Sequence, residues 1–168
     1  MKDLKNYIVE SMPEEMTETT NDTDLKKYTD ELVEMCFNAL SEERQEKFRN
    51  YLIKKIDNMK PSSTKSEYLG KRGSYGMYFN DGYALYDRNF SCFDRKTKKI
   101  NGNPDDIKKH YKCSTYQIIF ATLFDYLQAN EVISNIGPEG HSVKIWRKME
   151  KAMIESFRKV IIEKNNIK

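Results

Sequence analysis

The sequence predicts a single helix-dominated α+β domain, with about five helices and a small antiparallel β-meander near residues 75–101. Apolar residues recur at intervals of three and four over most of the chain after residue 23, as they do on one face of a helix. Between residues 75 and 100 this period gives way to short aromatic runs separated by turn residues, which is typical of strands. A chain of 168 residues with 38% hydrophobic content is long and apolar enough for one core.

The first 23 residues differ in composition from the rest of the chain. Residues 11–23, SMPEEMTETTNDT, are polar, acidic and rich in threonine. Such a segment buries too little apolar surface to offset the entropy of ordering. We therefore expect residues 1–23 to be a leader and a flexible acidic linker, and residues 24–168 to form the α+β domain.

Two helices are predicted at the start of the domain. Ser41 followed by two glutamates is an N-cap with acids in the first turn, so it begins the second helix. Pro61 disfavours helical backbone before it and stops that helix near Lys60. We expect the two helices to pack as an αα-hairpin. The apolar stripe of the first is Leu25, Tyr28, Leu32, Val33, Cys36, Phe37 and Leu40, and that of the second is Phe48, Tyr51, Leu52, Ile56 and Met59.

The meander is predicted from the aromatic runs YGMYF, YALYD and FSCF. Asn80-Asp81-Gly82 is a strong hairpin signal, because an Asp-Gly pair suits a tight turn that needs positive φ. Residues 94–97, DRKT, predict a second turn before the sequence KKIN. Three or four short strands are expected.

Three further helices are predicted after the meander. Asn103-Pro104 followed by two aspartates is an N-cap with proline at the first helical position, and this helix should end near Lys112. Ser114 caps the next helix, which is apolar around nearly its whole circumference and so should be central. A long amphipathic helix follows over residues 143–161. We expect the helices over 25–40, 114–127 and 143–161 to share one core that includes Trp146.

Membrane insertion and secretion are not expected. No run approaches the roughly 18 apolar residues of a membrane span, and the N-terminus lacks the apolar region of a secretory signal. The three cysteines, Cys36, Cys92 and Cys113, are odd in number and widely spaced, which argues against a disulfide framework. A cytoplasmic location follows as the expectation.

The strongest candidate binding surface is the basic, aromatic-rich segment 71–112. The net charge of the chain is only +3, but this segment carries a clear basic excess. Lysines beside exposed aromatics bind single-stranded nucleic acid through phosphate neutralisation and base stacking. The alternative is that the lysines are simply solvated and that the aromatics, Tyr86 among them, pack against helices. The candidate residues for binding nucleic acid or a protein partner are Lys71, Arg72, Arg95, Lys96, Lys98, Lys99, Lys108, Lys109, Lys112, Tyr75 and Tyr78.

Other chemistry has weaker signals. Gly70, Gly73 and Gly76 around Lys71-Arg72 could form an anion-cradling loop, although the P-loop spacing is absent. His110 and Cys113 are three apart and could begin a metal site with Cys92 or Cys36, against the alternative that these cysteines are core residues. No nucleophile–base or paired-carboxylate motif is evident, and His141 lies in a Gly/Pro loop. The sequence therefore favours a binding protein over an enzyme, with no cofactor, metal or catalytic residue expected.

The N-terminus carries a resemblance. Met1-Lys2 followed by Tyr7-Ile8-Val9-Glu10 resembles the capsid-targeting leader of internal head proteins in T-even-type tailed phages, which is cut after an aliphatic or aromatic residue, any residue, and Glu. The corresponding cut here lies between Glu10 and Ser11. The resemblance covers ten residues, and the rest of the chain resembles no known family.

That resemblance implies a protein packaged in the virion head and delivered to the host cell. The resulting hypothesis is a non-enzymatic phage-type accessory protein that binds a host or defence macromolecule, for which we expect a protein partner. The alternative is a nucleic-acid-binding domain that uses segment 71–112.

Overall fold

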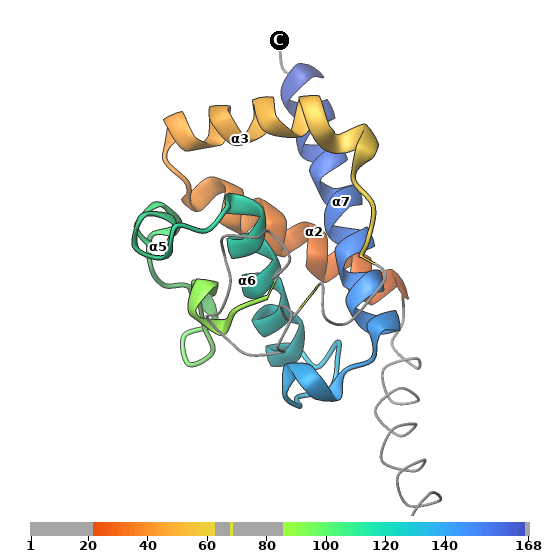
Figure 1. The fold of residues 1–168 in the computed structure, drawn as a ribbon. Helices are drawn as coiled ribbons and strands as arrows, with labels where there is room; N and C mark the ends of the chain where they lie inside the picture. The colour runs from red at the N-terminus through yellow and green to blue at the C-terminus, as the bar shows by residue number, and fades with distance from the viewer. Residues whose placement is uncertain (1–21, 63–67, 69–85, 167–168) are drawn as a thin grey trace, which may run out of the picture.

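The computed structural model of the chain describes residues 22–62, Tyr68 and residues 86–166 (Figure 1). These residues form one helix-dominated α+β domain, which confirms the predicted fold class. The α-helices with described bounds are α2 (Asp22–Ala39), α3 (Glu42–Lys55), α5 (Pro104–Tyr111), α6 (Thr115–Ala129) and α7 (Val143–Asn166). The strands are β1 (Phe93–Asp94) and β2 (Lys99–Ile100), and short 3-10 helices η1 (Ile56–Asn58), η3 (Arg88–Phe90) and η4 (Pro138–Gly140) connect the longer elements.

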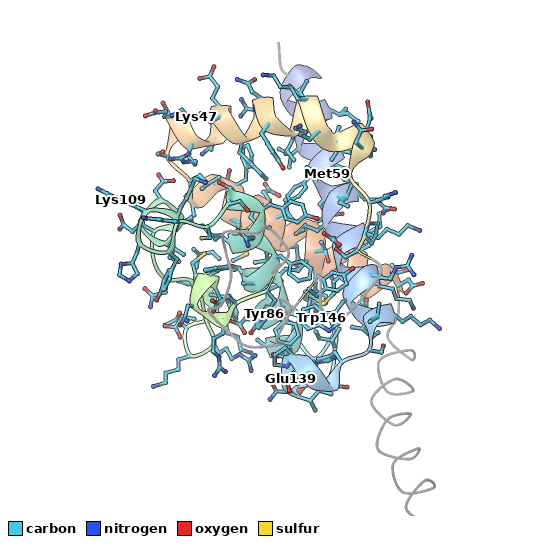
Figure 2. All side chains as sticks on the ribbon, viewed as in Figure 1. Lys47, Met59, Tyr86, Lys109, Glu139 and Trp146 are labelled. Carbon is cyan, nitrogen blue, oxygen red and sulfur yellow. The ribbon has the colours of Figure 1, made fainter. Side chains whose placement is uncertain are left out.

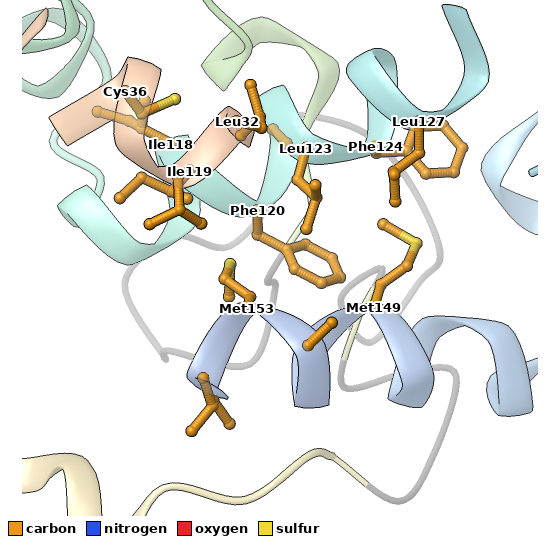
Figure 3. Close-up of a cluster of buried hydrophobic side chains, with 14 of the residues drawn as sticks. Leu32, Cys36, Ile118, Ile119, Phe120, Leu123, Phe124, Leu127, Met149 and Met153 are labelled. Carbon is orange, nitrogen blue, oxygen red and sulfur yellow. The ribbon is translucent and has the colours of Figure 1, made fainter. Parts of the chain in front are cut away.

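The helix α6 is the centre of the core, as its all-round apolar sequence predicts. Of its 15 residues, 11 are buried, and it packs between α2 and α7 (Figure 1). Figure 3 shows Phe120 pointing from α6 toward Met149 and Met153 of α7. Trp146 of α7 is fully buried in the same cluster. The prediction of one core shared by α2, α6 and α7 is confirmed.

The helix starts follow local signals in the sequence. The Ser41 hydroxyl accepts a hydrogen bond from the backbone N–H of Arg44 at 3.2 Å. The Asn103 side chain caps α5 through the N–H of Asp105 at 2.9 Å. Ser114 forms a capping box with Gln117 at the start of α6. All three predicted caps are confirmed.

The expectation of an αα-hairpin is wrong. The helices α2 and α3 diverge after the corner at Leu40-Ser41, and α3 crosses α7 near the C-terminal end of that helix (Figure 1). Phe48 packs edge-on against Phe157 of α7 at 5.4 Å between ring centroids. Only Phe48 and Leu52 of α3 are buried, so its apolar face is narrow, and near the corner Phe48 also meets Phe37 of α2 at 6.4 Å between ring centroids. The helix also ends at Lys55 and continues as η1, before the proline at 61.

The sheet is smaller than predicted in the described part of the chain. It consists of one antiparallel hairpin in which Phe93 pairs with Ile100 and Asp94 pairs with Lys99. The predicted turn over residues 94–97 is confirmed, with the Lys98 N–H bonded to the Asp94 carbonyl at 2.7 Å. Tyr86 and Asp87, which the run YALYD assigned to a strand, instead lead into η3, because the Asp87 side chain caps it through the N–H of Asn89. The runs YGMYF and Asn80-Asp81-Gly82 lie outside the described residues.

A buried carboxylate ties α6, α7 and the segment after η1 together. Glu150 of α7 is only 3% exposed. One of its oxygens accepts the backbone N–H of Ser62 at 2.9 Å, and the other accepts the hydroxyl of Tyr116. Burial and the charge of Glu150 raise the pKa of Tyr116 well above its ordinary value.

Candidate anion-binding groove

A groove separates α3 from α5 and from the first turn of α6. One part of it is a cavity of about 220 Å³. The helix α3 contributes cationic and aromatic side chains to one wall, and α5 and α6 contribute an amine and hydroxyls to the other. The lining residues are Arg44, Lys47, Phe48, Tyr51, Lys108, Ser114, Thr115 and Tyr116.

A second depression, of about 470 Å³, adjoins the first. It is lined by Ser41, Glu43, Arg44, Asp105, Asp106, Lys108, Lys109 and Lys112. Arg44 and Lys108 line both depressions, so the two form one surface, which we call the cationic groove. Lys47 on α3 and Lys109 on α5 project on the same side of the molecule (Figure 2).

Asp105 holds the two walls of the cationic groove together. Its carboxylate accepts the backbone N–H of Ser41 at 3.4 Å and lies 3.5 Å from Nε of Arg44. The start of α3 is therefore tied to the start of α5. Lys47 pairs with Glu43, another residue of the groove, at 3.0 Å, and this contact lowers the pKa of the Glu43 carboxyl.

Lys108 is a half-buried cation that lines both depressions of the cationic groove. Its amine donates to the carbonyl of Cys113 at 3.1 Å and makes no ion pair with a described carboxylate. Partial burial lowers the pKa of Lys108, and the positive charge of Arg44 lowers it further. An anion placed between Arg44 and Lys108 would relieve that repulsion.

The N-terminus of α6 adds to the positive potential. Ser114 and Thr115 at this terminus line the 220 Å³ cavity of the cationic groove. The first N–H groups of a helix have no intrahelical acceptor, and the helix dipole places a partial positive charge there. Three cationic side chains and a helix N-terminus thus face one cavity, an arrangement that attracts carboxylate or phosphate.

Sequence reasoning selected residues on one wall of the cationic groove and none on the other. Lys108, Lys109 and Lys112 were predicted, and all three line it. Arg44, Lys47 and Tyr51 were not predicted. Their spacing of three and four places them on one helical face, but the sequence does not indicate that this face lies over α5.

The predicted residues of the β1–β2 turn lie elsewhere. Arg95 bridges from the turn to the end of α6, where its guanidinium bonds to Asn135 at 2.9 Å, to Asp125 at 3.2 Å and to Gln128. It therefore holds the hairpin against α6. Three exposed lysines of the hairpin, Lys96, Lys98 and Lys99, are not among the residues that line the cationic groove.

Several predicted residues lie outside the described part of the chain. They are Lys71, Arg72, Tyr75 and Tyr78 of the candidate site, the glycines of the LGKRGSYG loop, and Glu10 and Ser11 of the leader. Tyr86 is described and is only 3% exposed, packed on Phe124 and Trp146. The interpretation of Tyr86 as a stacking platform is therefore wrong, and its alternative, packing against helices, holds.

The candidate metal ligands do not converge. His110 is exposed and lies edge-on to the ring of Tyr111, whereas the three cysteines are buried. Among the described residues no group of three or more His, Cys, Asp or Glu side chains is placed to hold a metal ion. His141 is buried against Phe124 and Trp146.

The fold and the site together define a helix-dominated α+β domain with a cationic groove formed by α3, α5 and α6. Comparison with protein-family models, with curated proteins and with solved structures finds no match to this chain. In the described ranges, none of the helices combines the length and the apolar character needed to cross a membrane.

Proposed function

We propose that this chain is a non-enzymatic accessory protein of phage type, and that its cationic groove seats an acidic segment of a host or defence protein. The observation that carries the proposal is the convergence of Arg44, Lys47 and Lys108 on the N-terminus of α6. Phe48 and Tyr51 line the same cavity. An acidic segment with an apolar or aromatic residue fits such a mixture of cations and rings.

Single-stranded nucleic acid is the second candidate ligand of the same groove. Tyr51 favours this ligand, because its side chain is 44% exposed and lines the cavity together with Lys47. An exposed ring next to cations can stack on a base while the cations neutralise phosphates. Lys108, Lys109 and Lys112 of the groove belong to the basic segment 71–112 that the sequence indicates.

Two double charge-reversal variants test whether binding depends on the cationic groove or only on the overall positive charge of the protein. Lys47→Glu with Lys109→Glu reverses two charges that line the groove, and Lys96→Glu with Lys99→Glu reverses two charges of the β1–β2 turn. We expect the wild-type chain and the variant with reversed charges in the turn to capture the same host protein. The variant with reversed charges in the groove, called the groove variant below, should bind that protein about tenfold or more weakly. Affinity capture with mass spectrometry, followed by a binding titration of the purified partner, measures this. Equal loss in both variants would refute the groove as the binding surface.

Salt dependence distinguishes the two ligands. In fluorescence anisotropy with a labelled single-stranded oligonucleotide, nucleic acid binding would lose affinity with a log–log slope of about -0.7 per phosphate neutralised. The groove variant would flatten that slope, and Tyr51→Ala would cost about 1–3 kcal/mol without changing it. We expect no such binding at low salt if the partner is a protein.

The leader is tested by processing. When the chain is co-expressed with the head-maturation protease of a T-even-type phage, we expect cleavage between Glu10 and Ser11, so that intact-mass spectrometry finds a chain beginning at Ser11. Glu10→Gln should block the cleavage, because the protease recognises a glutamate before the cut. The matched control Glu14→Gln should be processed normally. An uncut wild-type chain would contradict the phage-type assignment while leaving the groove proposal standing.

A further inference from the structure

A separate pocket lies on the other flank of α3, enclosed by α2, α3 and α7. Its volume is about 300 Å³, which is within the range of small-ligand sites. Val33 and Phe37 of α2 and Val160 of α7 provide apolar walls. None of the residues that line the cationic groove lines this pocket.

Arg49 is the unusual residue of this pocket. Its Nε is buried and has no hydrogen-bond partner in the described part of the chain. Its guanidinium lies over the ring of Phe37, 5.5 Å from the ring centroid, and makes no ion pair with a described carboxylate. A buried donor without an acceptor is destabilising, and a guanidinium stacked on a ring presents its planar fork to a carboxylate.

The other charges of the pocket indicate what the ligand carries. Asp30 is already engaged, because its carboxylate pairs with Lys159 at 2.7 Å and accepts the hydroxyl of Ser156. Glu34, the remaining acid in the lining, is exposed at the mouth of the pocket and has no hydrogen bond or ion pair with a described residue. Besides the Asp30–Lys159 pair, the lining thus offers one cation, Arg49, and one exposed anion, Glu34, that make no ion pair with a described residue.

We propose that this pocket binds a free α-amino acid with an apolar side chain. Its carboxylate pairs with Arg49, its ammonium group faces Glu34, and its side chain packs against Val33, Phe37 and Val160. A phosphate dianion fits less well, because Glu34 and Asp30 line the same pocket and would repel it. The proposal is independent of the cationic groove.

The test uses the full chain with leucine and phenylalanine as probes, in isothermal titration calorimetry and by chemical-shift perturbation. We expect saturable binding of one or both. Arg49→Gln should weaken that binding about tenfold or more, as expected for the loss of a charge-assisted hydrogen bond. Arg49→Lys keeps the positive charge but lacks the planar guanidinium, so its affinity should lie between those of the wild type and of Arg49→Gln. The matched control Arg147→Gln, an exposed arginine of α7 outside the pocket, should bind as the wild type does.

Two ligand analogues test each end of the site. Phenethylamine lacks the carboxylate, so its affinity should be the same for the wild-type chain and for Arg49→Gln. N-acetylphenylalanine lacks the ammonium group and should be insensitive to Glu34→Gln, which weakens binding of phenylalanine itself. Thermal unfolding of each variant establishes that it is folded. Absence of binding by the wild-type chain at millimolar probe, or binding unaffected in a folded Arg49→Gln variant, would overturn the proposal.

Discussion

Replacing Phe124 with alanine is expected to lower the free energy of unfolding by about 3–5 kcal/mol. Phe124 is only 2% exposed and lies in the most aromatic part of the core. Its ring is stacked on Trp146 at 5.0 Å and meets Tyr86 edge-on at 4.9 Å. Because α6 is enclosed by α2 and α7, the surrounding side chains have little freedom to fill the cavity that the substitution leaves.

Equilibrium urea unfolding followed by circular dichroism measures this loss. Lys151→Ala is the matched control, because Lys151 is an exposed residue of α7 and surface changes of this kind stay within about 0.5 kcal/mol. A loss below about 1 kcal/mol for Phe124→Ala would mean that α6 is not the central helix.

The parts of the fold that the sequence predicts well are those with a local cause. Ser114 and Asn103 are followed by the residues that complete their caps, so the helix starts are encoded within four positions. The α6 segment is apolar all round, and only a helix surrounded by others can bury such a surface. The turn between β1 and β2 is likewise a local signal.

The parts that the sequence does not predict depend on contacts between distant segments. The placement of α3 over α7 rests on Phe48 against Phe157, and no local pattern distinguishes that contact from packing on α2. The cationic groove depends on Asp105 joining the starts of α3 and α5. Lysine-rich composition predicted one wall of the groove but also selected Arg95, whose partners come from α6 and the loop after it. Composition does not separate solvated lysines from structural arginines.

The helix α3 is the element that connects the two proposed sites. Arg44, Lys47 and Tyr51 recur at helical spacing on the flank that lines the cationic groove. Gln45 and Arg49, four residues apart, lie on the flank that lines the pocket with α2 and α7. A helix with a cavity on each flank can bury only a narrow strip, which accounts for the burial of Phe48 and Leu52 alone. Ligand binding on either flank would add contacts to a helix that has few.

The pH dependence of stability should reflect the network around Glu150. The pKa of Tyr116 is raised above the value of 10.0 that an exposed tyrosine has, so the folded chain holds the phenolic proton more tightly than the unfolded chain does. The stabilising contribution of Tyr116 is therefore complete below about pH 10 and is lost as the pH rises further. Tyr116→Phe should make the unfolding free energy less sensitive to pH in this alkaline range.

Replacing Glu150 with alanine is expected to cost about 3–5 kcal/mol, because removing the partner of a buried polar network leaves its other members unsatisfied. The N–H of Ser62 and the hydroxyl of Tyr116 would both lose their acceptor. Urea unfolding of the single variants and of Glu150→Ala with Tyr116→Phe gives a double-mutant cycle. Since Tyr116→Phe removes one of the donors that Glu150→Ala strands, the double variant should be less destabilised than the sum of the single variants. Strict additivity of the two changes would mean that the Tyr116–Glu150 hydrogen bond contributes nothing to the stability of the core.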